Sequence, residues 1–96
     1  MKFNILRPAR LEFEDAIEHY NQERPGLGYQ FAAELRSTFK RIEQFPEAWH
    51  PLSKNTRRCR LKGFPYAVIY NATDQEIIVL ALMHMRRDPD SWKGRS

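Results

Sequence analysis

The run Ile77–Met83 is the feature that most constrains this chain, because it is apolar at every position. A half-buried strand alternates apolar and polar residues, whereas a strand covered on both faces does not. We therefore predict a strand in the middle of a sheet. Two further strands are predicted before it: residues 58–62, where arginine and lysine alternate with apolar residues, and residues 66–70, which are dense in β-formers.

In the first half of the chain, most apolar residues recur with a different spacing. Residues 2–6 alternate as a short strand does, and Pro8 follows where a helix is able to begin. Two apolar stripes with helical spacing come next. Their members are Ala9, Phe13, Ala16, Ile17 and Tyr20 in the first, and Phe31, Leu35, Phe39 and Ile42 in the second. The break at residues 24–26 is short, so the two helices form an antiparallel hairpin.

These elements predict an α+β fold in a single domain spanning residues 1–96. Its order is strand, helix, helix, strand, strand, strand and a short C-terminal tail, with a mainly antiparallel sheet. Both helices pack their stripes on one face of that sheet. About a dozen residues follow the last strand, so we expect the opposite face to be concave, partly apolar, partly cationic and open to a partner.

Charge is distributed unevenly along the chain. Residues 1–50 contain seven lysines and arginines against eight acidic residues, whereas residues 51–96 contain nine against four. No acidic residue lies between Glu47 and Asp74. A basic patch attracts nucleic acid, an acidic protein or anionic lipid, and charge alone does not choose among them.

Several classes of protein are disfavoured by the sequence. Cys59 is the only cysteine, so no disulfide forms within the chain. No apolar run approaches the roughly 18 residues of a membrane span, and the N-terminus lacks the apolar core of a signal peptide. His19 and His50 have no partner at metal-ligand spacing. We expect a cytoplasmic protein with no membrane partner, no metal and no cofactor.

Short motifs occur at particular places along these elements: Ala16 and Tyr20, Gly28 and Phe31, Ile42 to Pro46, Phe64-Pro65-Tyr66, Ile69-Tyr70, His84 to Pro89, and Trp92. Their joint order resembles the RelE/ParE superfamily of toxins, and the ParE-like branch more closely. The resemblance implies the toxin of a type II toxin–antitoxin module, which inhibits growth until a cognate antitoxin binds it. RelE-like members cut messenger RNA on the ribosome, whereas ParE-like members poison DNA gyrase.

RNA cleavage without a metal needs a proton acceptor, a proton donor and cations that stabilise the phosphorane. Carried over from the RelE-like pattern, Arg60 and Lys62 match its second-strand cations, and Arg86 matches its arginine after the last strand. His84 is the candidate acid or base, since its ordinary pKa of about 6.5 suits that role. This set defines a metal-independent, ribosome-dependent endoribonuclease as one alternative.

Two positions depart from the RelE-like pattern and favour a toxin that acts by binding. Ala67 occupies the place of an arginine, and Trp92 lies near the place of a tyrosine. An indole ring does not exchange a proton in that role, and Trp92 reads more readily as a packing residue under the sheet.

The residues predicted to bind the target or the antitoxin are therefore the basic side chains of the second strand and the tail, with the tail indole. They are Arg58, Arg60, Lys62, Arg86, Arg87 and Trp92. DNA gyrase is the target expected first. A third alternative is a nucleic-acid-binding module without toxicity, whose affinity falls steeply with salt.

Overall fold

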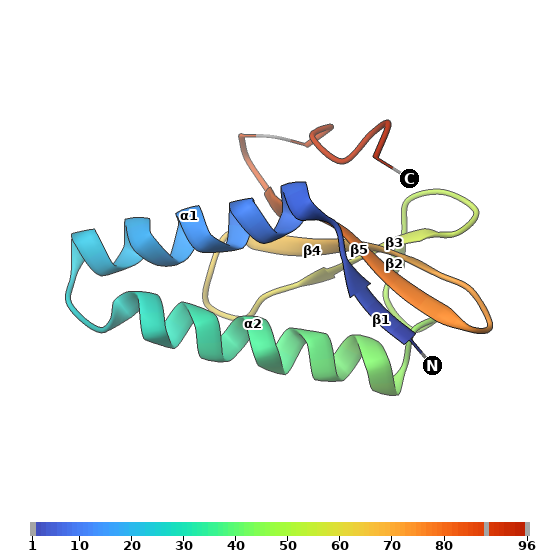
Figure 1. The fold of residues 1–96 in the computed structure, drawn as a ribbon, viewed down its shortest axis with the longest axis horizontal. Coiled ribbons are helices and arrows are strands. Elements are labelled where there is room, and N and C mark those ends of the chain that lie inside the picture. The colour runs from blue at the N-terminus through green and yellow to red at the C-terminus, as the bar shows by residue number, and fades with distance from the viewer. Residues whose placement is uncertain (1, 88, 96) are drawn as a thin grey trace.

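The computed structural model describes residues 2–87 and 89–95, which form five strands and two helices (Figure 1). In chain order these are β1 (Lys2–Ile5), α1 (Arg7–Glu23), α2 (Leu27–Gln44), β2 (His50–Pro51), β3 (Thr56–Arg60), β4 (Tyr66–Ala72) and β5 (Glu76–His84). The α+β class and the order of the predicted elements are confirmed, and β2 is an additional strand that was not predicted. Among the described residues, no helix is long and apolar enough to cross a membrane.

The five strands form one sheet in the order β1-β5-β4-β3-β2. β1 runs parallel to β5, and the other neighbours are antiparallel. The apolar strand β5 thus lies inside the sheet, as predicted, between β1 and β4. Pairing with β1 ends at Val79, so the second half of β5 has no strand on that side. Helix α1 packs against β5 instead.

A tight connection holds the two helices together. Gly26 ends the break between them in a left-handed conformation with φ of 90°, which glycine adopts without strain. Gly28 then packs on α1, where its amide donates to Asn21 Oδ1 at 2.8 Å. A Cβ atom at position 28 would lie 2.3 Å from the carbonyl oxygen of Ile17. The close packing of the hairpin therefore requires glycine, which has no side chain, at position 28.

The helices bury their stripes against one face of the sheet, which we call the helix side. Phe31 of α2 lies at the centre of an aromatic cluster, with ring centroids 5.1 Å from Tyr20 and 5.0 Å from Phe64. Such edge-to-face and tilted contacts add to the free energy gained from burial. Tyr70 is fully buried on this side and donates to the Pro46 carbonyl at 2.6 Å. Its hydroxyl anchors the chain after α2.

A β-bulge changes the face to which β5 directs its side chains. Ile69 of β4 pairs with Ala81, but Tyr70 pairs with Val79, so Leu80 is the extra residue. Val79 and Leu82 lie in the helix-side core, while Leu80 and Ala81 both belong to the core on the other face. The run Ile77–Met83 is accordingly buried on two sides, apart from partly buried Ile78.

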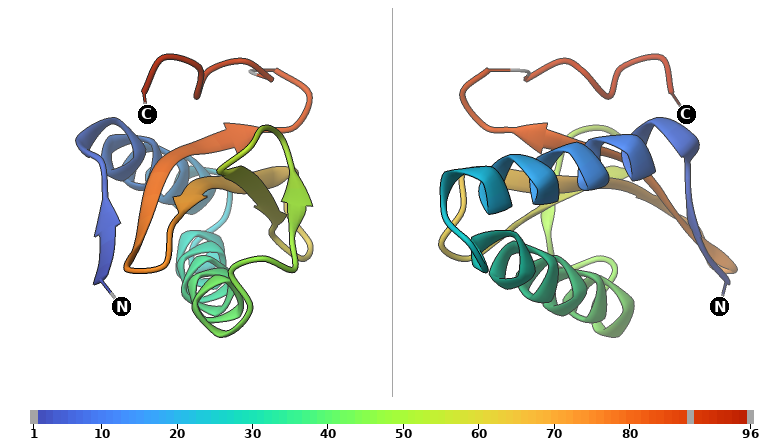
Figure 2. Two further views of the ribbon diagram at one scale, coloured as in Figure 1. Left: turned by 90° about the vertical axis from the view of Figure 1, so that its right-hand side faces the viewer. Right: turned by 60° about the vertical axis from the view of Figure 1, so that its left-hand side comes forward.

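The second face, which we call the tail side, is not open as the sequence led us to expect. Its cluster of Ala67, Ile69, Leu80, Ala81 and Met83 is at most 3% exposed. Residues 85–87 and 89–95 run on the far side of β5 from α2 (Figure 2). Trp92 and Leu52 pack on the cluster from the tail and from the loop before β3. One indole covers a large apolar area, so a tail of about a dozen residues is sufficient to cover this face of the sheet.

The strand boundaries also differ from the prediction. β2 lies in a segment where no strand was predicted, because His50 and Pro51 pair with Arg58 and Arg57. Strand β3 spans residues 56–60 rather than 58–62, and β4 continues to Ala72, beyond the predicted end at residue 70, because β5 pairs with it up to that residue. These differences arise from cross-strand pairing, which local composition does not predict.

The close approach of Gly28 to α1 gives a first prediction. Gly28→Ala should lower the free energy of unfolding by about 1–3 kcal/mol, as expected of overpacking against backbone that is unable to yield. Urea denaturation measures this change. Ser37→Ala, at an exposed position of the same helix, is the control. A Gly28→Ala protein within about 0.5 kcal/mol of the wild type would contradict the packing described.

Candidate functional site

The basic side chains of β3 lie on the tail side of the sheet. Arg58 pairs with Ile69 and Arg60 with Ala67, and residues opposite each other in a sheet share a face. Arg58 is half-buried, and its Nε has no hydrogen-bond partner within residues 2–87 and 89–95. Arg60 is exposed. Trp92, placed in the same predicted set, lies on this side as a packing residue.

His84 lies on the opposite, helix side. It pairs with Tyr66 across the β4–β5 ladder, and the two rings meet edge to face with centroids 5.0 Å apart. The Arg86 amide donates to His84 Nδ1 at 3.1 Å. Because Nδ1 accepts this bond, the proton of a neutral His84 ring is on Nε2. His84 and Arg60 therefore occupy opposite faces.

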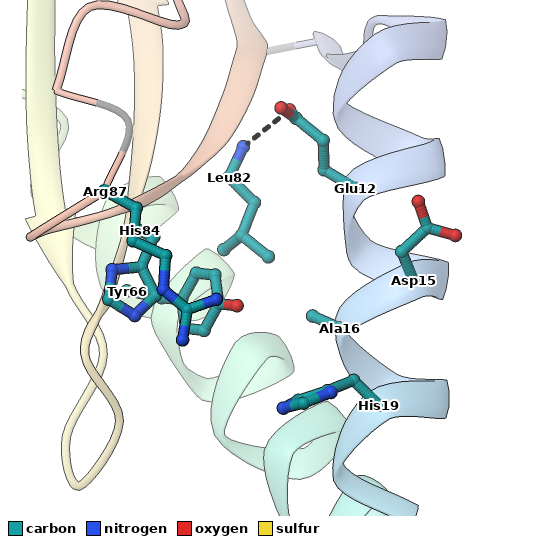
Figure 3. A pocket seen from close by; sticks show the side chains of 8 residues that line it. All are labelled: Glu12, Asp15, Ala16, His19, Tyr66, Leu82, His84 and Arg87. Atoms are coloured by element: carbon teal, nitrogen blue, oxygen red, sulfur yellow. Dashed lines mark hydrogen bonds between the residues drawn. The ribbon is translucent and has the colours of Figure 1, made fainter. Parts of the chain in front are cut away.

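A cavity of about 260 Å³ opens beside His84, between α1 and the end of β5 (Figure 3). The residues that line it come from α1, β4, β5 and the start of the tail: Glu12, Asp15, Ala16, His19, Tyr66, Leu82, His84 and Arg87. Of these, His84 and Arg87 were predicted from the sequence as site residues. No sequence motif links the α1 residues to β5.

One acidic residue of α1 completes the free edge of β5. Glu12 Oε1 accepts from the Leu82 amide at 3.2 Å and from Arg95 Nη1 at 2.8 Å. Arg95 also donates to the Leu80 carbonyl at 3.1 Å. Both side chains are less than a third exposed. This pair, the Glu12–Arg95 clamp, supplies the hydrogen bonds that a sixth strand would otherwise provide, and it holds the tail to α1.

A second ion pair fixes the segment that carries Lys62. Glu34 Oε2 on α2 accepts from the Lys62 amide at 2.7 Å and from Arg41 Nη2 at 2.8 Å. Thr38, fully buried, donates to the same oxygen at 3.2 Å. Burial alone would raise the pKa of Glu34, but the Lys62 amide and the Arg41 guanidinium outweigh it, so the pKa is lowered. The carboxylate is ionised and locks the end of β3.

Cys59 lies beside this network and is 1% exposed. Burial raises the pKa of its thiol, against the opposing effect of nearby Arg41. A neutral buried thiol is a poor nucleophile, so Cys59 is a packing residue. Within residues 2–87 and 89–95, no group of three or more His, Cys, Asp or Glu side chains is arranged to hold a metal ion.

The four residues of the proposed nuclease set are not brought into one cluster. His84 and Arg60 face opposite sides of the sheet, Lys62 lies past the end of β3 against α2, and Arg86 is exposed beyond β5. The register nevertheless places the end of β3 and the end of β5 at the same end of the sheet, because Tyr66, at the start of β4, pairs with His84. Arg60, Lys62 and Arg86 therefore lie at the same end of the sheet, although they do not form one cluster.

Comparison with known proteins agrees with this architecture. A sequence model described as "ParE toxin of type II toxin-antitoxin system, parDE" matches residues 4–89. The chain is 42% identical over 52 residues to Toxin ParE2 of Mycobacterium tuberculosis, in strains CDC 1551 and H37Rv. That match covers 54% of this chain and 50% of each relative, so it spans half of their length.

A solved structure shares the fold. This structure, described as "Chromosomal ParDE TA system from P. aeruginosa", superposes on the present protein with a TM-score of 0.70. The superposition covers 90% of this protein and 97% of the solved chain. Sequence identity is 13%. At that identity the likeness concerns the arrangement of helices and strands alone.

The Glu34 network gives a prediction with a defined pH dependence. A carboxylate with a lowered pKa stabilises the fold fully above the ordinary glutamate value of about 4.3, and this contribution is lost as the pH falls through the lower folded value. Glu34→Gln should cost about 1–3 kcal/mol at pH 7. Urea denaturation between pH 7 and pH 3 measures both effects.

The matched control is Glu43→Gln, an exposed glutamate on the same helix. The difference in stability between wild type and Glu34→Gln should shrink towards pH 3, while Glu43→Gln stays close to wild type throughout. A Glu34→Gln penalty that is independent of pH would refute the ionised carboxylate as its source.

Proposed function

Because this chain belongs to the ParE toxin family of type II toxin–antitoxin systems, we propose that it inhibits growth by binding DNA gyrase. A cognate antitoxin, which the family implies, holds it inactive. Binding, rather than cleavage of a substrate, is the mode of action proposed.

A group of unpaired cations at one end of the sheet supports a binding function. Arg60, Lys62, Arg86 and Arg87 are exposed, and within the described part of the chain none of their side chains forms an ion pair. Other basic residues are engaged, since Arg41 pairs with Glu34 and Arg95 with Glu12. Exposed unpaired cations raise the association rate with an acidic surface and are largely screened by salt.

The endoribonuclease alternative receives less support. General acid–base catalysis requires the proton-transferring group and the stabilising cations to surround one scissile bond. His84 and Arg60 lie on opposite faces of the sheet, so a single phosphodiester does not reach both in this conformation.

The proposed target is tested with purified gyrase. We expect the wild-type protein to inhibit DNA supercoiling, and Arg60→Gln/Lys62→Gln to need a roughly tenfold higher concentration, because rim charges contribute to association. Lys54→Gln, an exposed lysine before the start of β3 and so at the other end of that strand from Arg60, is the control. Unaltered supercoiling at concentrations that arrest growing cells would eliminate gyrase as the target.

A parallel assay with translating ribosomes separates the alternatives. Cuts in messenger RNA that disappear in Arg86→Ala would replace the gyrase proposal with the RelE-like activity. Harmless expression without the antitoxin, together with steeply salt-dependent DNA or RNA affinity, would instead indicate a nucleic-acid-binding module.

A further inference from the structure

Arg87, one of the exposed cations named above, also lines the cavity between α1 and the end of β5, whose other residues the proposed function does not use. We propose that this cavity is a binding site for a single carboxylate side chain, aspartate or glutamate, presented by a protein partner and paired with Arg87. Identification of that partner as the antitoxin rests on the proposed function, whereas the preference for a carboxylate does not.

The lining of the cavity suits a short acidic side chain. Ala16 and Leu82 provide an apolar surface for its methylene groups, and the rings of Tyr66 and His84 stand beside Arg87 (Figure 3). A volume of about 260 Å³ holds several waters at about 30 Å³ each. This space is sufficient for one carboxylate group.

Arg87 is the permanently charged side chain that a ligand in this cavity is able to pair with. It is exposed and forms no ion pair or hydrogen bond within residues 2–87 and 89–95. The neighbouring carboxylates do not compete for it: Glu12 binds the Leu82 amide and Arg95, and Asp15 points away from Arg87 (Figure 3). One guanidinium matches one carboxylate, which it binds through two parallel hydrogen bonds.

The charge of α1 argues against a phosphate of nucleic acid in the same place. Between Leu11 and Arg24 this helix carries five acidic residues and no lysine or arginine. His19, the basic residue of that stretch on the cavity wall, pairs with Glu23 at 3.1 Å. A polyanion laid along this wall is repelled by like charges. The site therefore selects one acidic side chain within an otherwise neutral or basic segment of polypeptide.

The carboxylate preference is tested without knowing the partner. N-acetylglutamate amide is titrated into the ¹⁵N,¹³C-labelled protein, with N-acetylglutamine amide as the uncharged match. We expect the glutamate derivative to shift resonances of Ala16, Tyr66, Leu82 and His84 with an affinity on the order of millimolar. Arg87→Gln should weaken this binding at least roughly tenfold, and Arg36→Gln should leave it unchanged.

Three results would overturn the site. They are equal shifts with the glutamine derivative, equal affinities in Arg87→Gln and Arg36→Gln, and tighter binding of inorganic phosphate or a single-stranded RNA oligonucleotide to the same residues. If Arg87→Gln fails to fold, the comparison of the two derivatives and phosphate on the wild-type protein decides the question by itself.

The identity of the partner is tested with the candidate antitoxin, which is the protein encoded beside this one. Arg87→Gln should bind it at least roughly tenfold more weakly than Arg36→Gln does. Undiminished antitoxin binding, with the glutamate derivative still bound in the cavity, would overturn the partner and keep the carboxylate site. Neither outcome depends on whether gyrase is the target.

Discussion

Burial of β5 on both faces is the constraint on which this structure depends. A strand that is apolar along Ile77–Met83 is unstable in water unless both surfaces are covered. The helical hairpin covers one surface and the C-terminal tail, through Trp92, covers the other. The bulge at Leu80 divides the apolar side chains between these two cores. β1 and β4 pair with β5 directly, and β3 and β2 extend the sheet beyond β4.

The backbone groups of β5 that no strand pairs with need other hydrogen-bond partners, and side chains provide them. β1 pairs only as far as Val79, and exposed backbone groups beyond it would invite pairing with another chain. The Glu12–Arg95 clamp binds the Leu82 amide and the Leu80 carbonyl there. α1 and the tail therefore meet at this clamp beside the cavity, while the cations past β5 remain exposed.

The sequence predicted most of the secondary structure but less of the site. Helical stripes and strand alternation are local, so the hairpin and the character of β5 followed from spacing alone. The bulge at Leu80 and the sealing of the tail side depend on pairing between distant residues, and were missed. The same holds for the cavity, where His19 and Tyr66 approach His84 from elements far apart in the chain. Of the basic residues predicted for the second strand and the tail, Arg60 and Arg87 are exposed, whereas Arg58 is half-buried.

Closure of the sheet on both sides is tested most directly by nuclear Overhauser effects from the Trp92 indole. We predict cross-peaks to the methyl groups of Ile69, Leu80 and Met83, with slow exchange of the Leu82 amide, which Glu12 protects. An indole without such cross-peaks, together with a rapidly exchanging Leu82 amide, would mean that the tail side is open in solution and would contradict this account.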